Sequence, residues 1–349
     1  MYLWRNRKRV EQTLINRAKE LIQGASNIVI TAHKSPDGDA VGSVWGLCLY
    51  LQKIGKNATV VLPDPAAEFL DWIPGSNETL FFNKSTEVCE KALRDADLWF
   101  ALDYNTRSRT GTDMAAVLNT LESPCVMIDH HHQPETFPAV LFSDTSMCST
   151  AQMIYMFIEA MGDIDKIDER IGACLYCGIM TDTGSFRFPS VTPKTHEIAA
   201  DLIRKGVDHA QIHRNVYDTN LLDRLRLVGF ALSEKLEVFK SYHAAIINLT
   251  KEELTRFNYR PGDTEGLVNQ ALSIKGVNFA VFVREGNNEV KLSFRSQGSF
   301  DVNTFARAHF SGGGHFNAAG GISTESIDVV LQKLQALLPE YEKQLAYDL

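Results

Sequence analysis

The stretch AHKSPDGDAVGS, residues 32–43, decides how the fold is interpreted. It follows the apolar run NIVIT and places His33, Asp37 and Asp39 on one turn, with a glycine between the two acids. An aspartate after a strand is often a helix N-cap, and Asp39 would cap a helix that begins at the next residue. Three side chains able to bind a metal, on one turn after a buried strand, also predict a metal site.

The first 150 residues alternate between short apolar runs and helical patterns. The runs that we expect to be strands are 27–32, 57–62, 97–102, 125–130 and 139–144. The stretches that we expect to be helices between them are 41–54, 86–94 and 112–121. Such alternation is typical of βα units, so the sequence predicts an α/β fold with a mostly parallel sheet and helices on both faces. In such sheets the ligand site lies beyond the carboxyl ends of the strands.

The pattern changes in the second half of the chain. Residues 149–206 are mainly helical, with an interruption at 181–193, and a helical stretch at 220–236 has no strand beside it. Strand patterns follow at 242–250, 277–285 and 289–296, and helical patterns at 264–274 and 327–344. We therefore expect a first domain over 1–206, a helical linker over 207–240 and a smaller α/β domain over 241–349.

Composition limits the classes of function. The chain has 349 residues and a formal net charge of −8, which argues against a general grip on long nucleic acid, because such binding uses many phosphate contacts. We find no apolar core of a signal peptide and no apolar run long enough to span a membrane. The six cysteines are scattered among apolar neighbours, which is typical of reduced, buried thiols in a cytoplasmic protein.

Acids and histidines follow the ends of several predicted elements. Besides the turn at 32–43, they are Asp103 after WFAL, Asp129-His130-His131-His132 after VMI, and Asp182 after the helical run GIM. One such residue alone is more often a cap or a hydrogen-bonded structural group. Several at one sheet edge favour a cation, because crowded carboxylates repel each other unless they are neutralised. Mixed aspartate and histidine ligands suit Mn²⁺ or Mg²⁺, and Zn²⁺ less well, and the acids suffice for two ions that share one carboxylate.

A second group of candidate residues lies near the C-terminus. Arg295 lies in the strand pattern SFRS. A glycine run ends in a histidine nearby: Gly312, Gly313, Gly314 and His315. A glycine-rich loop can present backbone N–H groups to an anion, and arginine suits phosphate through its planar fork. Alone, these residues would equally fit a flexible turn with a surface arginine. Arg109 and Arg187 are weaker candidates for phosphate contacts, and both could be solvated charges.

Five blocks of the sequence together resemble the DHH phosphoesterase superfamily. They are HKSPDGDAVGS, LDYNTRSR, IDHHHQP, GIMTDTGSFRF and LSFRSQGSFDVNTFARAHFSGGGHFNAAGG. The first four are similar in order and spacing to the four motifs of that family. The last resembles its associated C-terminal domain, with a GGGH signature. The resemblance covers nearly the whole chain and implies a metal-binding phosphoesterase domain over 1–206 and a substrate-binding domain over 241–349.

The resemblance also implies a role for each matching residue. The implied ligands of the first ion are His33 and Asp37, those of the second are Asp39, His130 and Asp182, and Asp103 would bridge the two ions. His131 would face the substrate phosphate or position the attacking water, and Asp129 would support the neighbouring histidines. His132 has no implied role, and we expect it to be structural. Arg295 and the GGGH loop would hold a terminal phosphate or base of the substrate.

Within the superfamily, the compact two-domain plan favours the branch of nano-RNases and 3′-phosphoadenosine 5′-phosphate phosphatases. The expected substrates are short single-stranded RNA or nucleotide phosphates, with no long duplex and no membrane as partner, and a homodimer is compatible with the sequence. The alternatives are a cyclic- or linear-dinucleotide phosphodiesterase, a RecJ-like single-strand exonuclease and an exopolyphosphatase-related hydrolase. A degenerate protein that only binds nucleotides is the non-enzyme alternative. A RecJ-like enzyme would need an added binding domain and a basic channel, and neither is visible in the sequence.

Overall fold

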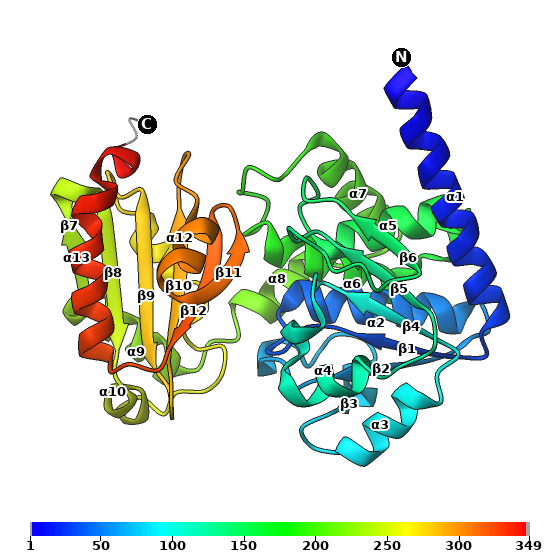
Figure 1. Ribbon diagram of the computed structural model, residues 1–349, viewed down its shortest axis with the longest axis horizontal. Coiled ribbons are helices and arrows are strands. Elements are labelled where there is room, and N and C mark those ends of the chain that lie inside the picture. Colours follow the sequence, from blue (N-terminus) through cyan, green and yellow to red (C-terminus); the bar gives the residue numbers. More distant parts are fainter. Residues whose placement is uncertain (1, 347–349) are drawn as a thin grey trace. The chain divides into compact units, whose positions relative to one another are not determined.

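The chain divides into two compact units, and the division falls between Thr219 and Asn220 (Figure 1). The computed structural model describes residues 2–346, and side chains over residues 12–346. The stretch 207–240, expected to be a helical linker, is shared between the units: helix α8 (His209–Tyr217) lies in the first, and helix α9 (Leu222–Glu234) and strand β7 (Leu236–Phe239) lie in the second.

The first unit is built on a six-stranded parallel sheet in the order β3-β2-β1-β4-β5-β6. Its strands are β1 (Asn27–Thr31), β2 (Asn57–Leu62), β3 (Leu80–Phe81), β4 (Leu98–Leu102), β5 (Cys125–Asp129) and β6 (Val140–Ser143). Its other helices are α1 (Tyr2–Gly24), α2 (Gly38–Lys53), α3 (Thr86–Arg94), α4 (Thr112–Leu118), α5 (Thr150–Met161), α6 (Glu169–Asp182) and α7 (Pro193–Arg204). The predicted parallel α/β sheet is confirmed, while the sequence patterns gave no sign of α1 or of the two-residue strand β3.

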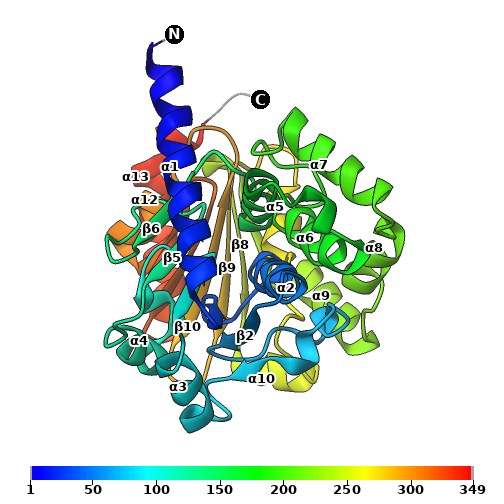
Figure 2. The ribbon, with the colours of Figure 1, turned by 90° about the vertical axis from the view of Figure 1, so that its right-hand side faces the viewer.

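Both faces of this sheet are covered by helices, as predicted. In β1, Ile28 and Ile30 join the core beneath α2, α5 and α6, whereas Val29 between them joins the core beneath α3 and α4. Alternate residues of a strand point to opposite faces, so the part of a strand that is buried on both faces is mainly apolar, as in residues 28–30 of β1 and in all of β4. Figure 2 shows α3 and α4 on one side of the sheet and α2 and α6 on the other.

Helices α2 and α6 approach each other along glycines. A Cβ atom at Gly42 would collide with the backbone carbonyl oxygen of Cys174, and one at Gly46 would meet the Leu175 side chain at 2.6 Å. On the other helix, a Cβ atom at Gly178 would lie 2.9 Å from a carboxylate oxygen of Asp39. The glycines therefore bring the start of α2, with its acids, against the end of α6.

The second unit is a mixed six-stranded sheet in the order β11-β12-β10-β9-β8-β7, in which only β8 and β9 run parallel. Besides β7, its strands are β8 (Ala244–Leu249), β9 (Phe279–Glu285), β10 (Val290–Ser296), β11 (Ser311–His315) and β12 (Ala318–Ser323). Besides α9, its helices are α10 (Lys251–Arg256), α11 (Leu267–Leu272), α12 (Val302–His309) and α13 (Ile327–Leu345). Short 3-10 helices complete the chain at 68–70, 76–78, 107–110, 164–166 and 240–242.

Two expectations for this unit need correction. The helical stretch at 220–236 is not a free linker, because Leu227 and Ala231 of α9 pack into the core of the second sheet. The glycine-rich segment before His315 is not a loop: it is strand β11, which pairs antiparallel with β12 from Ser311↔Ile322 to His315↔Ala318. The segments β7, β12 and α12 were not predicted.

No helix among the described residues is long and apolar enough to cross a membrane. The six cysteines all lie in the described part of the chain, and each is buried as a free thiol. This confirms the expectation that the cysteines are buried.

We predict that Gly42→Ala destabilises the protein by about 1–3 kcal/mol, because the added methyl group has no space between α2 and α6. The matched control is Gly229→Ala, since Gly229 also lies inside a helix, α9, but a Cβ atom there would meet nothing within 4 Å. The control should gain about 0.5–1 kcal/mol from better helix propensity. Thermal unfolding followed by circular dichroism measures both. A Gly42→Ala protein as stable as the parent would show that α2 and α6 are not closely packed at this glycine.

Candidate metal centre

The acids and histidines of the first unit converge at the carboxyl edge of its sheet. His33, Asp37 and Asp39 follow β1, Asp103 follows β4, Asp129 ends β5 with His130 and His131 behind it, and Asp182 ends α6. Most of these side chains are buried: His33, Asp39, Asp103, Asp129, His130 and His131 are each less than 9% exposed. Parallel strands bring their carboxyl ends to one edge, which explains why residues so distant in sequence meet.

The two aspartates of the first turn have different structural roles. Asp37, not Asp39, is the N-cap of α2: its carboxylate accepts hydrogen bonds from the backbone N–H groups of Asp39 and Ala40, both at 3.0 Å. The helix thus begins at Gly38, and the expectation that Asp39 caps it is wrong. Asp39 is instead 1% exposed, and its two oxygens accept the backbone N–H groups of Thr150 and Ala151 at 2.7 and 2.8 Å. These donors form the first turn of α5, where N–H groups have no partner inside the helix and favour negative charge.

Asp103 presents its two carboxylate oxygens to two different histidines. Its Oδ2 lies 3.3 Å from Nε2 of His33, and its Oδ1 lies 3.6 Å from Nε2 of His130. The residue has φ +61°, a left-handed conformation that aspartate tolerates better than most residues, and Thr150 Oγ1 donates to its Oδ1 at 3.0 Å. The two oxygens of Asp103 thus face different imidazoles, so that each could contact a separate ion.

Each histidine is oriented by a backbone carbonyl. Nδ1 of His33 lies 2.9 Å from the carbonyl oxygen of Lys34, and Nδ1 of His130 lies 3.2 Å from that of Met147. A carbonyl oxygen can only accept, so Nδ1 carries a proton and Nε2 is left to face the carboxylates. Hydrogen bonds of this kind are the usual way in which proteins orient metal-binding imidazoles.

His130 stands at the centre of the second group of donors. Its Nε2 lies 3.8 Å from Asp39, 3.6 Å from Asp103 and 3.5 Å from Asp182, too far for hydrogen bonds to any of them. A divalent ion with ligands at about 2.1 Å separates neighbouring donor atoms by about 3 Å, so a small contraction around an ion would satisfy all four groups. His33, Asp37 and Asp103 form the corresponding first group, with donor atoms within 4.8 Å of one another.

The electrostatics of the centre call for positive charge. Burial raises the pKa of Asp39 well above its usual range, and the neighbouring charges of Asp103 and Asp182 raise it further. Burial opposes ionisation of Asp103 as well, but a hydrogen bond from His33 and the charges of the histidines outweigh it and lower the pKa of Asp103. Burial alone would lower the pKa of His33, yet the same hydrogen bond and the charge of Asp37 raise it. A divalent cation would neutralise the charge of these carboxylates more fully than one shared proton.

Asp129 and His131 form a separate buried pair beside the two groups. Asp129 Oδ1 lies 2.7 Å from Nδ1 of His131, and its Oδ2 accepts the backbone N–H of the same residue at 3.1 Å. Burial, with a contribution from the charge of Asp103, raises the pKa of Asp129 to about 6. Burial and the nearby Arg109 hold the pKa of His131 well below its usual range. The pair therefore fixes the orientation of the His131 imidazole through its Nδ1 atom.

The remaining candidates lie in three places. Arg109 belongs to the 3-10 helix Arg107–Thr110, and its backbone carbonyl accepts the N–H of Lys34, the residue after His33, at 2.8 Å. Arg187 is exposed in the loop after α6. In the second unit, Arg295 of β10 and His315 of β11 are level with each other, because both pair with Ala318 of β12. His132 is exposed, and only its backbone carbonyl has a role, as the acceptor of Asn105 Nδ2 at 2.5 Å.

Sequence reasoning missed two residues that hold the centre together. Thr150 binds Asp39 through its backbone and Asp103 through its hydroxyl group, and Asn105 ties the segment after β4 to the segment after β5. The sequence offered a signal for the first, since Ser149 is an ordinary N-cap for the helix that Thr150 begins. We know of no comparable signal for Asn105.

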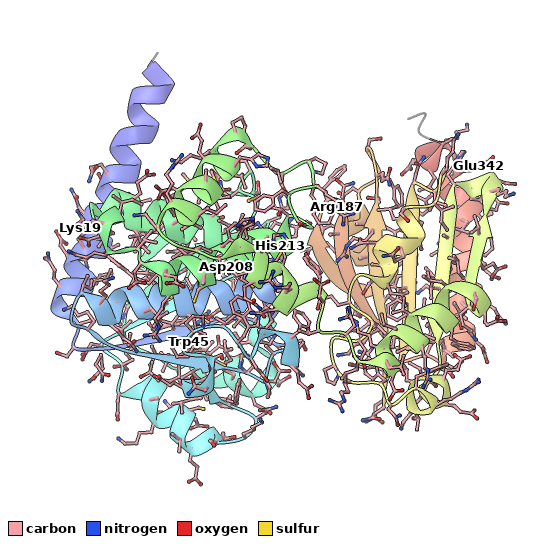
Figure 3. All side chains as sticks on the ribbon, turned by 180° about the vertical axis from the view of Figure 1, so that it is seen from behind. Lys19, Trp45, Arg187, Asp208, His213 and Glu342 are labelled. Carbon is pink, nitrogen blue, oxygen red and sulfur yellow. The ribbon has the colours of Figure 1, made fainter. Side chains whose placement is uncertain are left out.

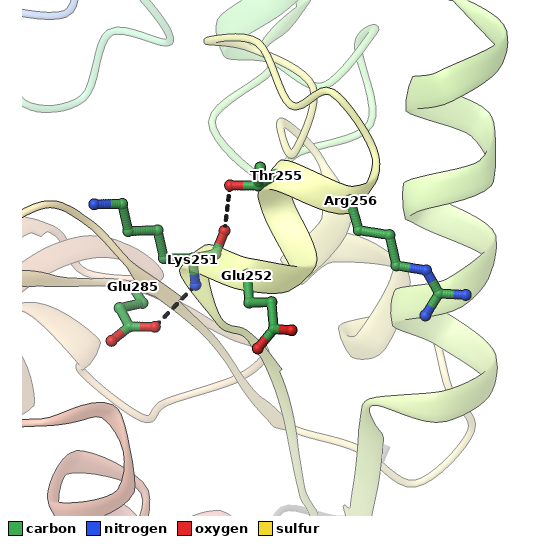
Figure 4. A pocket seen from close by; sticks show the side chains of 5 residues that line it. All are labelled: Lys251, Glu252, Thr255, Arg256 and Glu285. Carbon is green, nitrogen blue, oxygen red and sulfur yellow. Dashed lines mark hydrogen bonds between the residues drawn. The ribbon is translucent and has the colours of Figure 1, made fainter.

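The second unit also has an open pocket at α10 (Figure 4). It is lined by Lys251, Glu252, Thr255, Arg256 and Glu285. Two basic and two acidic side chains balance each other there, and Glu285 already accepts the backbone N–H of Lys251 at 2.8 Å. The pocket therefore has no charge preference, and we assign no function to it.

Comparison with known proteins gives two matching domains. The N-terminal domain of the DHH family matches residues 27–179, and the DHHA1 domain matches residues 241–346. The bifunctional oligoribonuclease and PAP phosphatase NrnA of Bacillus subtilis is 29% identical over 332 residues, which cover 93% of this chain and 99% of that protein. The protein of the same name from Thermus thermophilus is 32% identical over 301 residues, 84% of this chain and 83% of that one.

A solved structure is similar over the same length. The crystal structure of an exopolyphosphatase-related protein from Bacteroides fragilis superposes with a TM-score of 0.91 at 38% identity, and covers 96% of this chain and 98% of that one. The two-domain plan is therefore shared from end to end with this protein as well as with the curated relatives.

We predict that Asp103→Asn removes the second bound ion and lowers hydrolysis by more than about a hundredfold, beyond the loss typical of a residue that only orients a ligand. The amide keeps the size of the side chain but loses the charge that faces both histidines. The control is Asp95→Asn, an exposed residue whose ion pair with Lys91 is on the surface. Metal analysis after gel filtration in Mn²⁺ gives the stoichiometry. A variant with two ions and normal turnover would contradict the shared role of Asp103.

We also predict that added Mn²⁺ or Mg²⁺ raises the unfolding temperature more at about pH 8 than at about pH 5, because protons and metal ions compete for carboxylates and imidazoles. Without metal, the raised pKa of Asp39 means that the folded state binds more protons than the unfolded state above about pH 4, so this group destabilises the fold as pH rises. Thermal unfolding across this range, with metal and with chelator, measures the difference. A gain that does not change with pH would count against these carboxylates as ligands.

Proposed function

This chain belongs to the DHH family of phosphoesterases and carries a DHHA1 domain, and we propose that it is a two-metal hydrolase of short oligoribonucleotides and of 3′-phosphoadenosine 5′-phosphate. The observation that carries the proposal is the placement of Asp103, whose two oxygens face His33 and His130 separately. A site for one ion would not need a carboxylate divided in this way. The relatives named as oligoribonuclease and PAP phosphatase supply the substrate class.

The ligands in this proposal are those that surround the two imidazoles. His33, Asp37 and Asp103 would hold one ion, and Asp39, Asp103, His130 and Asp182 would hold the other. Oxygen ligands with one imidazole at each ion suit Mn²⁺, and Mg²⁺ is the second choice. When bound, the pair of ions would activate a water molecule and stabilise charge on the phosphoester oxygens.

The chain's own residues would then bind and orient the substrate. His131, held by Asp129 through Nδ1, would contact a phosphate oxygen or the attacking water through Nε2. Arg109, whose backbone carbonyl is bonded to Lys34 beside His33, is a second candidate for a phosphate contact. Arg187 is a further candidate for a contact with a substrate phosphate.

In the second unit, the substrate would be held at the glycine strand. Arg295 is half-buried at the end of β10 and is level with His315, with only Ala318 between them. Gly312, Gly313 and Gly314 place no side chains on β11, and the N–H of Gly314 donates to Asn303 Oδ1 at 2.9 Å. The planar fork of an arginine at this level suits a phosphate or a base at one end of a substrate.

The charge of the chain favours short substrates. With a net charge of −8, a long strand would add phosphates that meet few basic residues. This argues against the RecJ-like exonuclease, and the cyclic-dinucleotide and polyphosphate hydrolases remain as outcomes of the test below. A cytoplasmic location is part of the proposal, supported by six buried free thiols.

We predict that kcat/KM falls as RNA lengthens from about 3 to about 20 nucleotides, and that it depends weakly on salt, because few phosphates are neutralised. The assay is a length series in Mn²⁺ at two ionic strengths, with 3′-phosphoadenosine 5′-phosphate, a cyclic dinucleotide and polyphosphate in parallel. Rates that rise with length, or that fall steeply with salt, would move the assignment to a long-strand exonuclease. A preference for the cyclic dinucleotide or for polyphosphate would replace the proposed substrate.

A further inference from the structure

The loop that follows Asp182 has an unusual backbone. Gly184, Ser185 and Phe186 are three consecutive residues with positive φ, at +56°, +63° and +63°. Glycine adopts this conformation freely, but serine and especially phenylalanine rarely do, and such residues persist only where their surroundings hold them. The contacts of these residues, inside the loop and outside it, must therefore stabilise the conformation.

Hydrogen bonds inside the loop tie this conformation to the position of Arg187. The carbonyl oxygen of Thr183 accepts the backbone N–H of Arg187 at 2.9 Å. The carbonyl oxygen of Gly184 accepts Nε of the same arginine at 2.7 Å. Among the described residues, the two terminal nitrogens of Arg187 have no recorded hydrogen-bond partner, so the fork is available for a ligand. The position of the guanidinium group therefore depends on the conformation of the loop.

The external support comes from α7 and α8. Ser185 Oγ lies 3.1 Å from Nε2 of His213, whose Nδ1 donates to the carbonyl oxygen of His209 at 2.8 Å. That carbonyl places the proton on Nδ1, so Nε2 of the neutral ring accepts the Ser185 hydroxyl. Phe186 stacks on His196, with ring centroids 5.6 Å apart and planes inclined by 26°. Figure 3 labels Arg187 and His213, both in the first unit.

The two supports have different consequences. Phe186 packs against the main core of the first unit, so its contact with His196 contributes to folding in general. The hydrogen bond between Ser185 and His213 involves a half-buried histidine, whose ring also lies near those of Tyr176 and Tyr217. Its effect is to fix the middle of the loop, directly beside the carbonyl group that holds Arg187.

We propose that His213 is a positioning residue: it holds the loop 184–187 so that Arg187 presents its guanidinium group to a substrate phosphate. The inference rests on the proposed function and assigns a role to α8 that the metal centre does not need. His213 itself contacts neither the metal ligands nor the substrate. Its loss should therefore affect binding of the substrate and leave the ions in place.

The test measures KM, kcat and bound Mn²⁺ with a trinucleotide RNA. His213→Ala should raise KM about threefold to tenfold, the effect of one neutral hydrogen bond, with kcat and two bound ions unchanged. Ser185→Gly should do the same, because it keeps the left-handed backbone and removes only the hydroxyl group. His213→Gln, which can still bond to Ser185, should restore most of the affinity. His209→Ala is the matched control on the same helix and should keep the parent KM, because it removes ring contacts with Tyr176 and His213 but keeps the backbone carbonyl that orients His213.

A double variant separates positioning from general stability. If His213 acts through Arg187, adding His213→Ala to Arg187→Ala should change KM no further. Provided that the parent enzyme cleaves short RNA, four results would each overturn the inference. They are additive effects in the double variant, an unchanged KM for His213→Ala, no rescue by His213→Gln, and a normal KM for Arg187→Ala. A parent enzyme that does not cleave short RNA would overturn the proposed function, and this inference with it.

Discussion

Repulsion among buried carboxylates is the constraint on which the rest of the first unit depends. Asp39 and Asp103 are almost fully buried within reach of the same imidazole, and burial with mutual charge raises the pKa of Asp39. Holding such groups together without a cation is unfavourable, so the fold must impose it. It does so through the glycine seam between α2 and α6, where Gly42 and Gly178 let the two helices approach closely, and through the first turn of α5, whose N–H groups bind Asp39. The free energy of this packing offsets the repulsion between the carboxylates, and a bound metal ion would neutralise them.

The same strain marks the places where the chain is built for chemistry. Asp103 has a left-handed backbone at the point where β4 ends, and three more left-handed residues follow Asp182. These segments carry the carboxylate that faces both histidines and the loop that holds Arg187. Backbone conformations of this kind are costly and persist where surrounding contacts determine them. The first unit therefore contributes a sheet edge to the site, while the loop after α6 is held by one side-chain hydrogen bond from α8 and by ring stacking on α7.

Much of this could be predicted from the sequence, for physical reasons. Strands buried on both faces are continuous apolar runs, so β1, β2, β4, β5 and β6 were visible, and acids at their ends pointed to one edge. Two aspartates within three residues left the choice of N-cap open, and the wrong one was chosen, because only the hydrogen bonds of Asp37 decide it. Strand β11 was taken for a loop because glycine has no strand propensity of its own, and pairing with β12 creates the strand. Thr150 and His213 act through tertiary contacts that no local pattern records.

The central claim is that one buried carboxylate divides its oxygens between two metal ions. The most direct measurement is anomalous X-ray scattering from crystals of the protein grown or soaked with Mn²⁺, recorded on both sides of the manganese absorption edge. The account predicts two peaks about 3.5–4 Å apart, on either side of the Asp103 carboxylate, one near His33 and one near His130. A single peak, or two peaks with Asp103 bound to only one of them, would contradict it.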